Sequence, residues 1–147
     1  MNLKMIYYRL KLKMAINFKL KSGTFYSIID LKHYPRRIGK TTLLAKFVQK
    51  DNPSYLIEPT KEMARYCRDT AREVLGRDIP VMSVGELVHL TYSSRGLVNN
   101  VRPSSIHLYL DEEVSPEDML SLLKMGYKVK IYLKAHHFDK DILDYEG

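Results

Sequence analysis

The stretch Arg36-Arg37-Ile38-Gly39-Lys40-Thr41-Thr42 stands between a run of apolar residues and a segment with helical periodicity. Residues 25–31, Phe-Tyr-Ser-Ile-Ile-Asp-Leu, precede it and predict a strand, because aromatic and β-branched residues predominate there. Residues 40–49 carry apolar residues at spacings of three and four, as in an amphipathic helix. The stretch is therefore predicted to form a glycine-containing loop that leads from a strand into the N-terminus of a helix.

Such a loop offers the donors that a triphosphate needs, because backbone N–H groups and the positive end of the helix dipole converge at its exit. Gly39 lets the backbone approach the phosphates without a Cβ in the way. Lys40 can reach the β- and γ-phosphates, where it serves binding and catalysis, and the Thr41 hydroxyl can ligate Mg²⁺. The usual pattern has another glycine at the position that Tyr34 occupies, so the loop must begin differently here. The residues expected to bind ATP are Arg37, Ile38, Gly39, Lys40, Thr41 and Thr42.

Beyond this loop, strand and helix patterns continue to alternate along the chain. Strands are expected at 54–58, 79–83, 106–110 and 127–133, and helices at 60–75, 84–90 and 116–124, with a surface loop over 91–105. Strands that alternate with helices predict an α/β fold with a mostly parallel sheet flanked by helices. Right-handed crossovers follow from that arrangement.

A second candidate site lies at the end of the strand expected at 106–110, which reads Ile-His-Leu-Tyr-Leu and is followed by three acids. The carboxyl ends of parallel strands are where α/β proteins bind ligands. Asp111 is expected to hold Mg²⁺ through the water shell of the ion, as a second-sphere partner of Thr41. Glu112 is expected to polarise the water that attacks the γ-phosphate. Glu113 is interpreted as a solvated carboxylate. The two segments together predict one magnesium-triphosphate site, whereas each alone has a common non-functional explanation.

Four stretches resemble the ATPase core of phage and virus terminase large subunits, which are DNA-packaging motors of the P-loop NTPase class. They are Arg36–Thr42, residues 55–64 with their Pro-Thr turn, Ser94-Arg95-Gly96-Leu97, and residues 108–117 around the acidic motif. The resemblance implies a P-loop NTPase fold, ATP hydrolysis with Mg²⁺, action on DNA and a viral source.

The same resemblance suggests roles for further side chains. It implies that Arg36 points at the γ-phosphate as a catalytic arginine. It also implies a γ-phosphate-sensing residue near the tip of the strand at 127–133, where Lys134, His136 and His137 lie, although adjacent histidines are more often surface residues. Terminases carry a nuclease domain after the ATPase, and the 147 residues leave no room for one, so a minimal relative is expected.

The N-terminal part of the chain is strongly basic. Residues 1–50 hold twelve Lys or Arg and one acid, whereas residues 51–147 hold twelve Lys or Arg and sixteen acids. Apolar residues fall on every even position from Leu10 to Leu20, and this period of two predicts a half-buried β-strand, with residues 3–8 as its hairpin partner. Alternatively, Met14 starts translation and the first thirteen residues are a disordered extension. The basic region is either a contact for duplex DNA or a lysine-rich face that keeps the protein soluble.

These observations predict one domain over residues 1–147. It comprises a basic strand or extension (1–23), a nucleotide-binding core (24–135) and an acidic tail (136–147). A single cysteine, Cys67, excludes an internal disulfide and a multi-cysteine zinc site, and the chain has no signal peptide or membrane-spanning run, so we expect a cytoplasmic protein, in a host cell if viral. Two alternatives to the ATPase stay open, a nucleotide-binding module without turnover and a small nucleoside kinase. A protein partner or a homo-oligomer is also compatible with the sequence.

Overall fold

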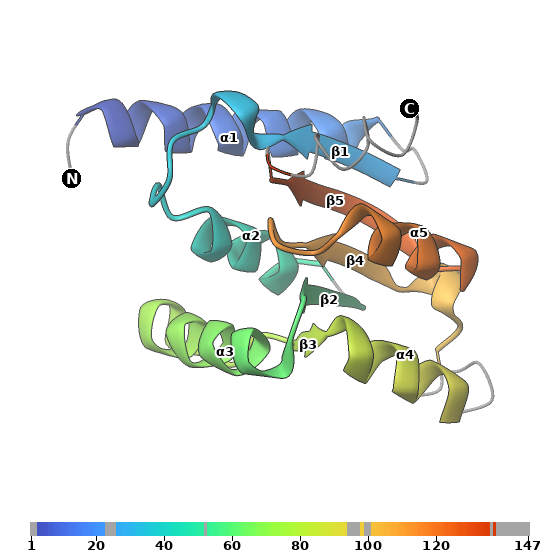
Figure 1. Ribbon diagram of the computed structural model, residues 1–147. Coiled ribbons are helices and arrows are strands. Elements are labelled where there is room, and N and C mark those ends of the chain that lie inside the picture. The colour runs from blue at the N-terminus through green and yellow to red at the C-terminus, as the bar shows by residue number, and fades with distance from the viewer. Residues whose placement is uncertain are drawn as a thin grey trace.

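The computed structural model describes residues 3–22, 26–51, 53–93, 98, 101–135 and 137, and it contains one five-stranded sheet with helices on both faces (Figure 1). The helices are α1 (Leu3–Lys21), α2 (Lys40–Gln49), α3 (Lys61–Leu75), α4 (Val84–Ser93) and α5 (Pro116–Lys124). The strands are β1 (Tyr26–Asp30), β2 (Ser54–Glu58), β3 (Val81–Ser83), β4 (His107–Leu110) and β5 (Lys128–Lys134). Two short 3₁₀ turns complete the fold, η1 (Leu31–His33) and η2 (Pro103–Ser105).

The sheet has the order β1-β5-β4-β2-β3, and every pair of neighbouring strands is parallel. The predicted α/β architecture, with its parallel sheet and flanking helices, is thereby confirmed. The last strand, β5, inserts between β1 and β4, so the segments that follow these three strands emerge side by side at the carboxyl edge of the sheet.

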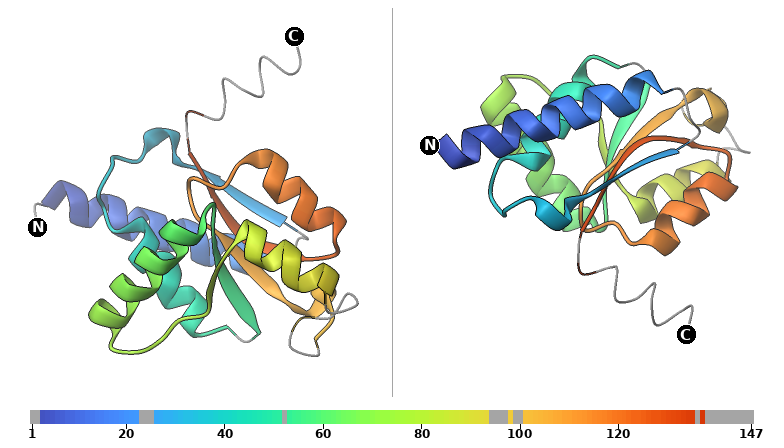
Figure 2. Two further views of the ribbon diagram at one scale, coloured as in Figure 1. Left: turned by 60° about the horizontal axis from the view of Figure 1, so that its bottom comes forward. Right: turned by 90° about the horizontal axis from the view of Figure 1, so that it is seen from above.

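The sheet separates the apolar core into two layers, and each layer is covered by helices. α1, α2 and α3 cover one face, where Leu44, Leu56 and Ile131 belong to one buried cluster (Figure 2). α4 and α5 cover the other face, where Leu87 and Val129 belong to a second. The connections on the two faces cross the sheet in opposite directions along its strand order. α2 leads from β1 toward the β3 edge to reach β2, whereas α5 leads from β4 back toward the β1 edge to reach β5. This reversal opens a crevice at the carboxyl edge, where α/β proteins bind ligands.

The predicted N-terminal β-strand or hairpin is wrong, because residues 3–21 form α1. Leu12 and Ile16 are fully buried one helical turn apart, whereas Leu10, Met14 and Phe18 are exposed. Among described residues, the run contains no Gly or Pro and is rich in Leu, Lys and Met, which favour helices. The apolar face of α1 packs on β1 and β5, and this contact selects the helix over the equally patterned strand.

The surface loop predicted over 91–105 is shorter than expected, because α4 continues through Ser93. Its remaining described part includes the buried Val98, which forms an antiparallel bridge with Val101, and η2. The segment 94–97, His136 and the acidic tail over 138–147 lie outside the described residues. No helix in the ranges that the structure describes combines the length and apolar character needed to cross a bilayer.

Candidate functional site

The loop over residues 34–39 begins with a ring that is held against α1. Tyr34 stacks edge-on with Tyr8, with ring centroids 6.1 Å apart, and Lys11 lies 5.5 Å from the centre of the Tyr34 ring. Burial, followed by the charge of Tyr7, raises the pKa of the Tyr34 phenol. Tyr34 stands where a glycine was expected, and in this fold it anchors the start of the loop on a neighbouring helix.

The loop ends in two residues with left-handed backbone conformations. Arg37 has φ of 62° and Gly39 has φ of 82°. Gly39 is the N-cap of α2 and supplies no capping side chain. The first intrahelical bond runs from the Leu43 N–H to the Gly39 carbonyl at 3.0 Å, so the N–H groups of residues 40–42 precede it. These donors and the helix dipole face the carboxyl edge of the sheet, as in anion-binding helix termini.

Lys40 is the first residue of α2, and its side chain is buried with 6% exposure. Its Nζ donates to the Pro35 carbonyl at 2.9 Å and lies 3.9 Å from Glu112 Oε2. A buried ammonium requires such partners, because an unpaired charge in this position would cost several kcal/mol (~3–5). Lys40 is thereby held across the loop and next to the acidic end of β4.

The loop and the acidic segment meet directly through Thr41 and Asp111. Thr41 Oγ1 donates to Asp111 Oδ2 at 2.8 Å across a sequence separation of 70 residues. Asp111 is only 3% exposed, and its other oxygen accepts the Glu112 N–H at 2.8 Å. The predicted convergence of Thr41 and Asp111 is therefore present in the fold.

Glu112 is half-buried at the mouth of the crevice. Burial raises the pKa of its carboxyl group; Lys40 and Arg36 act to lower it, and Asp111 and Glu113 to raise it further. Glu113 is exposed, and its Oε2 lies 3.7 Å from Nε2 of His137. A carboxylate with a raised pKa that lies beside a buried lysine is suited to proton transfer.

Most of these groups surround a cavity of about 770 Å³, called the loop cavity below. Asp111 lines an adjoining cavity of about 330 Å³, which shares Thr41, Glu112 and Glu113 with the loop cavity. The lining residues of the loop cavity come from the loop, from the start of α2 and from the ends of β4 and β5, and they include Arg36, Arg37, Gly39, Lys40, Thr41, Thr42, Glu112, Glu113 and His137. Ile38 differs from the other predicted binding residues, because its side chain is 1% exposed and packs into the core. Only the backbone of Ile38 can therefore contribute to this cavity.

Two residues at this edge were not anticipated from the sequence. Glu58 ends β2 and is 2% exposed, and burial followed by a hydrogen bond with Asp111 raises its pKa to about 10. At neutral pH the protonated Glu58 carboxyl therefore donates to Asp111. Burial, followed by the charge of Glu58, also raises the pKa of the Cys67 thiol. The signal in the sequence was an acid that ends an apolar run, the same signal that identified Asp111.

The second unanticipated residue is Arg9, which reaches the loop from α1. A Cβ placed on Gly39 would lie 3.6 Å from Cζ of Arg9 and 3.7 Å from one of its terminal nitrogens. The guanidinium therefore packs against the backbone of Gly39. Because α1 was predicted to be a strand, this contact could not be foreseen.

Within the described residues, no three His, Cys, Asp or Glu side chains gather into a group that could hold a metal ion. Mg²⁺ does not need such a cage, since it commonly binds one or two carboxylates together with substrate phosphates and water. The hydroxyl of Thr41 and the carboxylate of Asp111 are oxygen ligands of the kind that this ion prefers, so the donor set fits Mg²⁺ bound with a triphosphate.

Comparison with known proteins gives no relative, because no family model, curated protein or solved structure matches this chain. The resemblance to terminase ATPase cores therefore rests on the residues quoted above.

Proposed function

We propose that this protein hydrolyses a nucleoside triphosphate, ATP being the expected one, in the loop cavity with Mg²⁺. The observation that carries the proposal is the 2.8 Å hydrogen bond between Thr41 and Asp111. It joins the N-terminus of α2, which suits phosphate, to the strand end that bears the acids. The resemblance of both segments to terminase ATPases points to the same reaction and to the P-loop class.

Phosphate binding is assigned to the N-terminus of α2 and to three cations around the loop cavity. The backbone N–H groups of residues 40–42 would face the phosphate oxygens. Lys40 would neutralise charge on the β- and γ-phosphates, and Arg36 and Arg37 lie exposed on the same cavity. Arg36 already interacts with Glu112, so it lies near the group expected to act on the γ-phosphate.

Hydrolysis requires a base for the attacking water. In the proposed reaction the water oxygen bonds to the γ-phosphorus and the bond to the bridging oxygen breaks, which leaves ADP and phosphate. Glu112 accepts the proton from the water. Mg²⁺, held by Thr41 and Asp111, would neutralise charge on the phosphates when bound.

The direct test is phosphate release from Mg-ATP by the purified protein and by Lys40→Ala. We expect the substitution to lower turnover by ~100-fold or more, because it removes a buried charge aimed at the phosphates. Lys61→Ala is a matched control, since Lys61 is the first residue of α3 and is exposed. Both variants should keep the circular dichroism spectrum of the parent.

Three outcomes separate the functions. Phosphate release that depends on Lys40 but not on Lys61 supports the proposal. Nucleotide binding without phosphate release would identify a binding module and contradict it. Transfer of phosphate to an added nucleoside in place of water would identify a kinase.

A further inference from the structure

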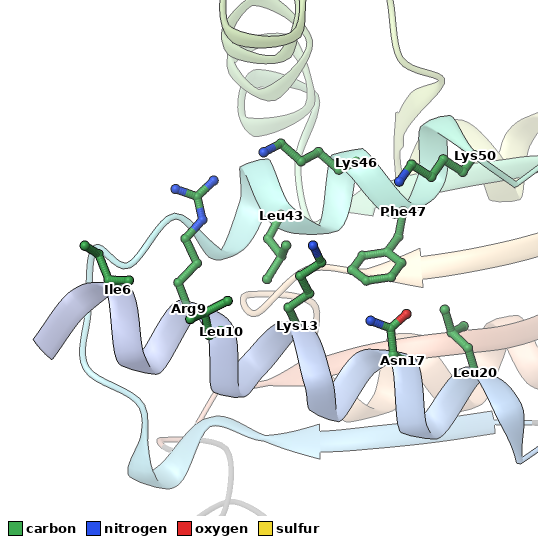
Figure 3. A pocket seen from close by; sticks show the side chains of 10 residues that line it. All are labelled: Ile6, Arg9, Leu10, Lys13, Asn17, Leu20, Leu43, Lys46, Phe47 and Lys50. Carbon is green, nitrogen blue, oxygen red and sulfur yellow. The ribbon is translucent and has the colours of Figure 1, made fainter. Parts of the chain in front are cut away.

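A groove of about 660 Å³ runs between α1 and α2, on the same face of the sheet as the loop (Figure 3). Arg9 and Lys13 point from α1 toward α2, and Leu43 and Phe47 point from α2 toward α1 (Figure 3). Lys46 and Lys50 continue the lining along α2. We call this feature the α1–α2 groove.

The groove carries charge of only one sign. Four of the ten described residues that line it are Lys or Arg, namely Arg9, Lys13, Lys46 and Lys50, and none of these ten is acidic. On each helix the two cations are four residues apart, which places them ~6 Å apart along the helix axis. Two pairs of cations with the same spacing fit a polymer with repeated negative charges better than a single anion.

The remaining lining is mainly apolar, with Phe47 and Leu43 between the two pairs of cations (Figure 3). A duplex presents phosphates on its outside and keeps its bases stacked inside, so its bases would not contact the apolar side chains of the groove. A single strand exposes bases that can lie on aromatic side chains while its phosphates contact flanking cations. The combination of a cation on each side and a ring between them therefore favours a single strand.

We infer that the α1–α2 groove binds single-stranded nucleic acid, with its phosphates on Arg9, Lys13, Lys46 and Lys50 and a base against Phe47. The inference does not depend on the proposed hydrolysis, because the groove is lined by other residues than the loop cavity. The charge pattern argues against a second copy of the groove as occupant, since it would bring eight cations together.

The experiment measures binding of a fluorescein-labelled oligothymidylate, ~16 nucleotides long, by fluorescence anisotropy in the absence of ATP. Neutralising Arg9, Lys13, Lys46 and Lys50 to Gln should weaken binding at least about tenfold at ~100 mM salt. It should also make the slope of log K against log salt shallower by ~3, since each phosphate contact on a single strand contributes ~0.7. Over ~50 to ~200 mM salt, these four contacts alone correspond to a loss of about 50-fold in the parent protein.

A charge-matched control neutralises four exposed cations outside the groove, Lys61, Arg65, Arg102 and Lys124, also to Gln. It should bind the oligonucleotide with the parent slope. An equal loss in this control would overturn the inference, because binding would then follow net charge alone. Thermal melting of both quadruple variants verifies that they are folded.

Phe47→Leu tests the base contact while it keeps an apolar side chain in the core. We expect at least about fivefold weaker binding of the oligothymidylate. Two further results would overturn the assignment of a single strand. One is a duplex of the same length that binds as tightly as the single strand, with Phe47→Leu having no effect. The other is polyglutamate that displaces the oligonucleotide at equal charge concentration, which would identify an acidic peptide as the occupant.

Discussion

The loop cavity and the α1–α2 groove lie on either side of Gly39, and they differ in how their charge is built. The loop cavity combines cations with the acids Glu112 and Glu113 and with the backbone donors of a helix N-terminus. Among the described residues that line the groove, the charged ones are all cations, carried by long side chains from α1 and α2. A site with both signs and fixed donors can bind an anion and transfer protons, whereas a site of one sign can only bind.

α2 belongs to both sites, because its first residues line the cavity and its later turns line the groove. Lys40 is 6% exposed and partnered, whereas Lys46 and Lys50 are exposed. Burial therefore distinguishes these lysines. Lys40 holds its charge at a fixed place in the loop cavity, whereas Lys46 and Lys50 present exposed charges that can attract an anion. Apart from Arg9, which lines the groove and packs against Gly39 of the loop, substitutions in one site should leave the other unchanged. The following predictions test this separation.

The largest effect is expected for Glu112→Gln, which removes the assigned base but keeps the shape of the side chain. Turnover should fall by ~10²–10⁴-fold, and binding of nucleotide and of the oligothymidylate should persist. Because burial raises the pKa of Glu112, turnover in the parent should increase as pH rises through that pKa, and the variant should lose this dependence. Phosphate release over a pH series measures both effects. Unchanged turnover in the variant would remove Glu112 from the mechanism.

A smaller effect is expected for Asp111→Asn, which weakens the oxygen ligand shared with Thr41. The Mg²⁺ concentration needed for half-maximal turnover should rise by ~10–100-fold, while oligothymidylate binding in the groove stays constant. A Mg²⁺ titration of phosphate release measures the shift. Asp69→Asn, on the exposed side of α3, is the matched control and should leave the titration unchanged. Equal shifts in both variants would contradict the assigned ligand.

Counted per pH unit, the smallest effect is expected for Glu58→Gln, and it concerns stability. In the folded protein Glu58 keeps its proton up to a pKa of about 10, whereas in the unfolded chain it ionises near its usual value. Unfolding at neutral pH therefore releases a proton, so the free energy of unfolding decreases by up to ~1.4 kcal/mol per pH unit as pH rises between these values. Asp111, Glu112 and Cys67 are the titratable groups that interact with Glu58.

Urea unfolding of the metal-free protein at several pH values measures this slope. Glu58→Gln should make the slope of the unfolding free energy against pH shallower by ~1.4 kcal/mol per pH unit, the contribution of one proton. Glu62→Gln, at an exposed residue of α3, should keep the parent slope. A parent protein whose stability is independent of pH across the neutral range would show that Glu58 is ionised in the fold.

The sequence was sufficient to predict the central part of the fold. The strand at 54–58 and the helix at 40–49 have the predicted bounds, because Pro, Gly and capping residues mark their ends. Thr60 caps α3 by accepting the Met63 N–H, and Ser115 caps α5 by accepting the Asp118 N–H, and both are residue types favoured at this position. Local signals of this kind need no knowledge of tertiary contacts.

The N-terminal helix could not be predicted from periodicity, because apolar residues at every second position also fall at every fourth position, a spacing that fits one face of a helix. Leu12, Ile16 and Leu20 satisfy both patterns. Which of them is used depends on the sheet face that α1 covers, and that face is formed by residues far along the chain. The contact of Arg9 with Gly39 was missed for the same reason, since it depends on elements brought together by the fold. Glu58 carried the same sequence signal as Asp111, but its interaction with Asp111 exists only because the sheet places β2 beside β4.

The pairing of β1 has a consequence for how the protein is made. Within the described sheet β1 pairs only with β5, which follows the other four strands in the sequence. During synthesis on the ribosome, the strand that leads into the loop must therefore wait until residues 128–134 have been made before it gains a neighbour. A nascent chain that stops before Lys128 would already contain Lys40 and Asp111, but it would expose the unpaired edges of β1 and β4 to aggregation.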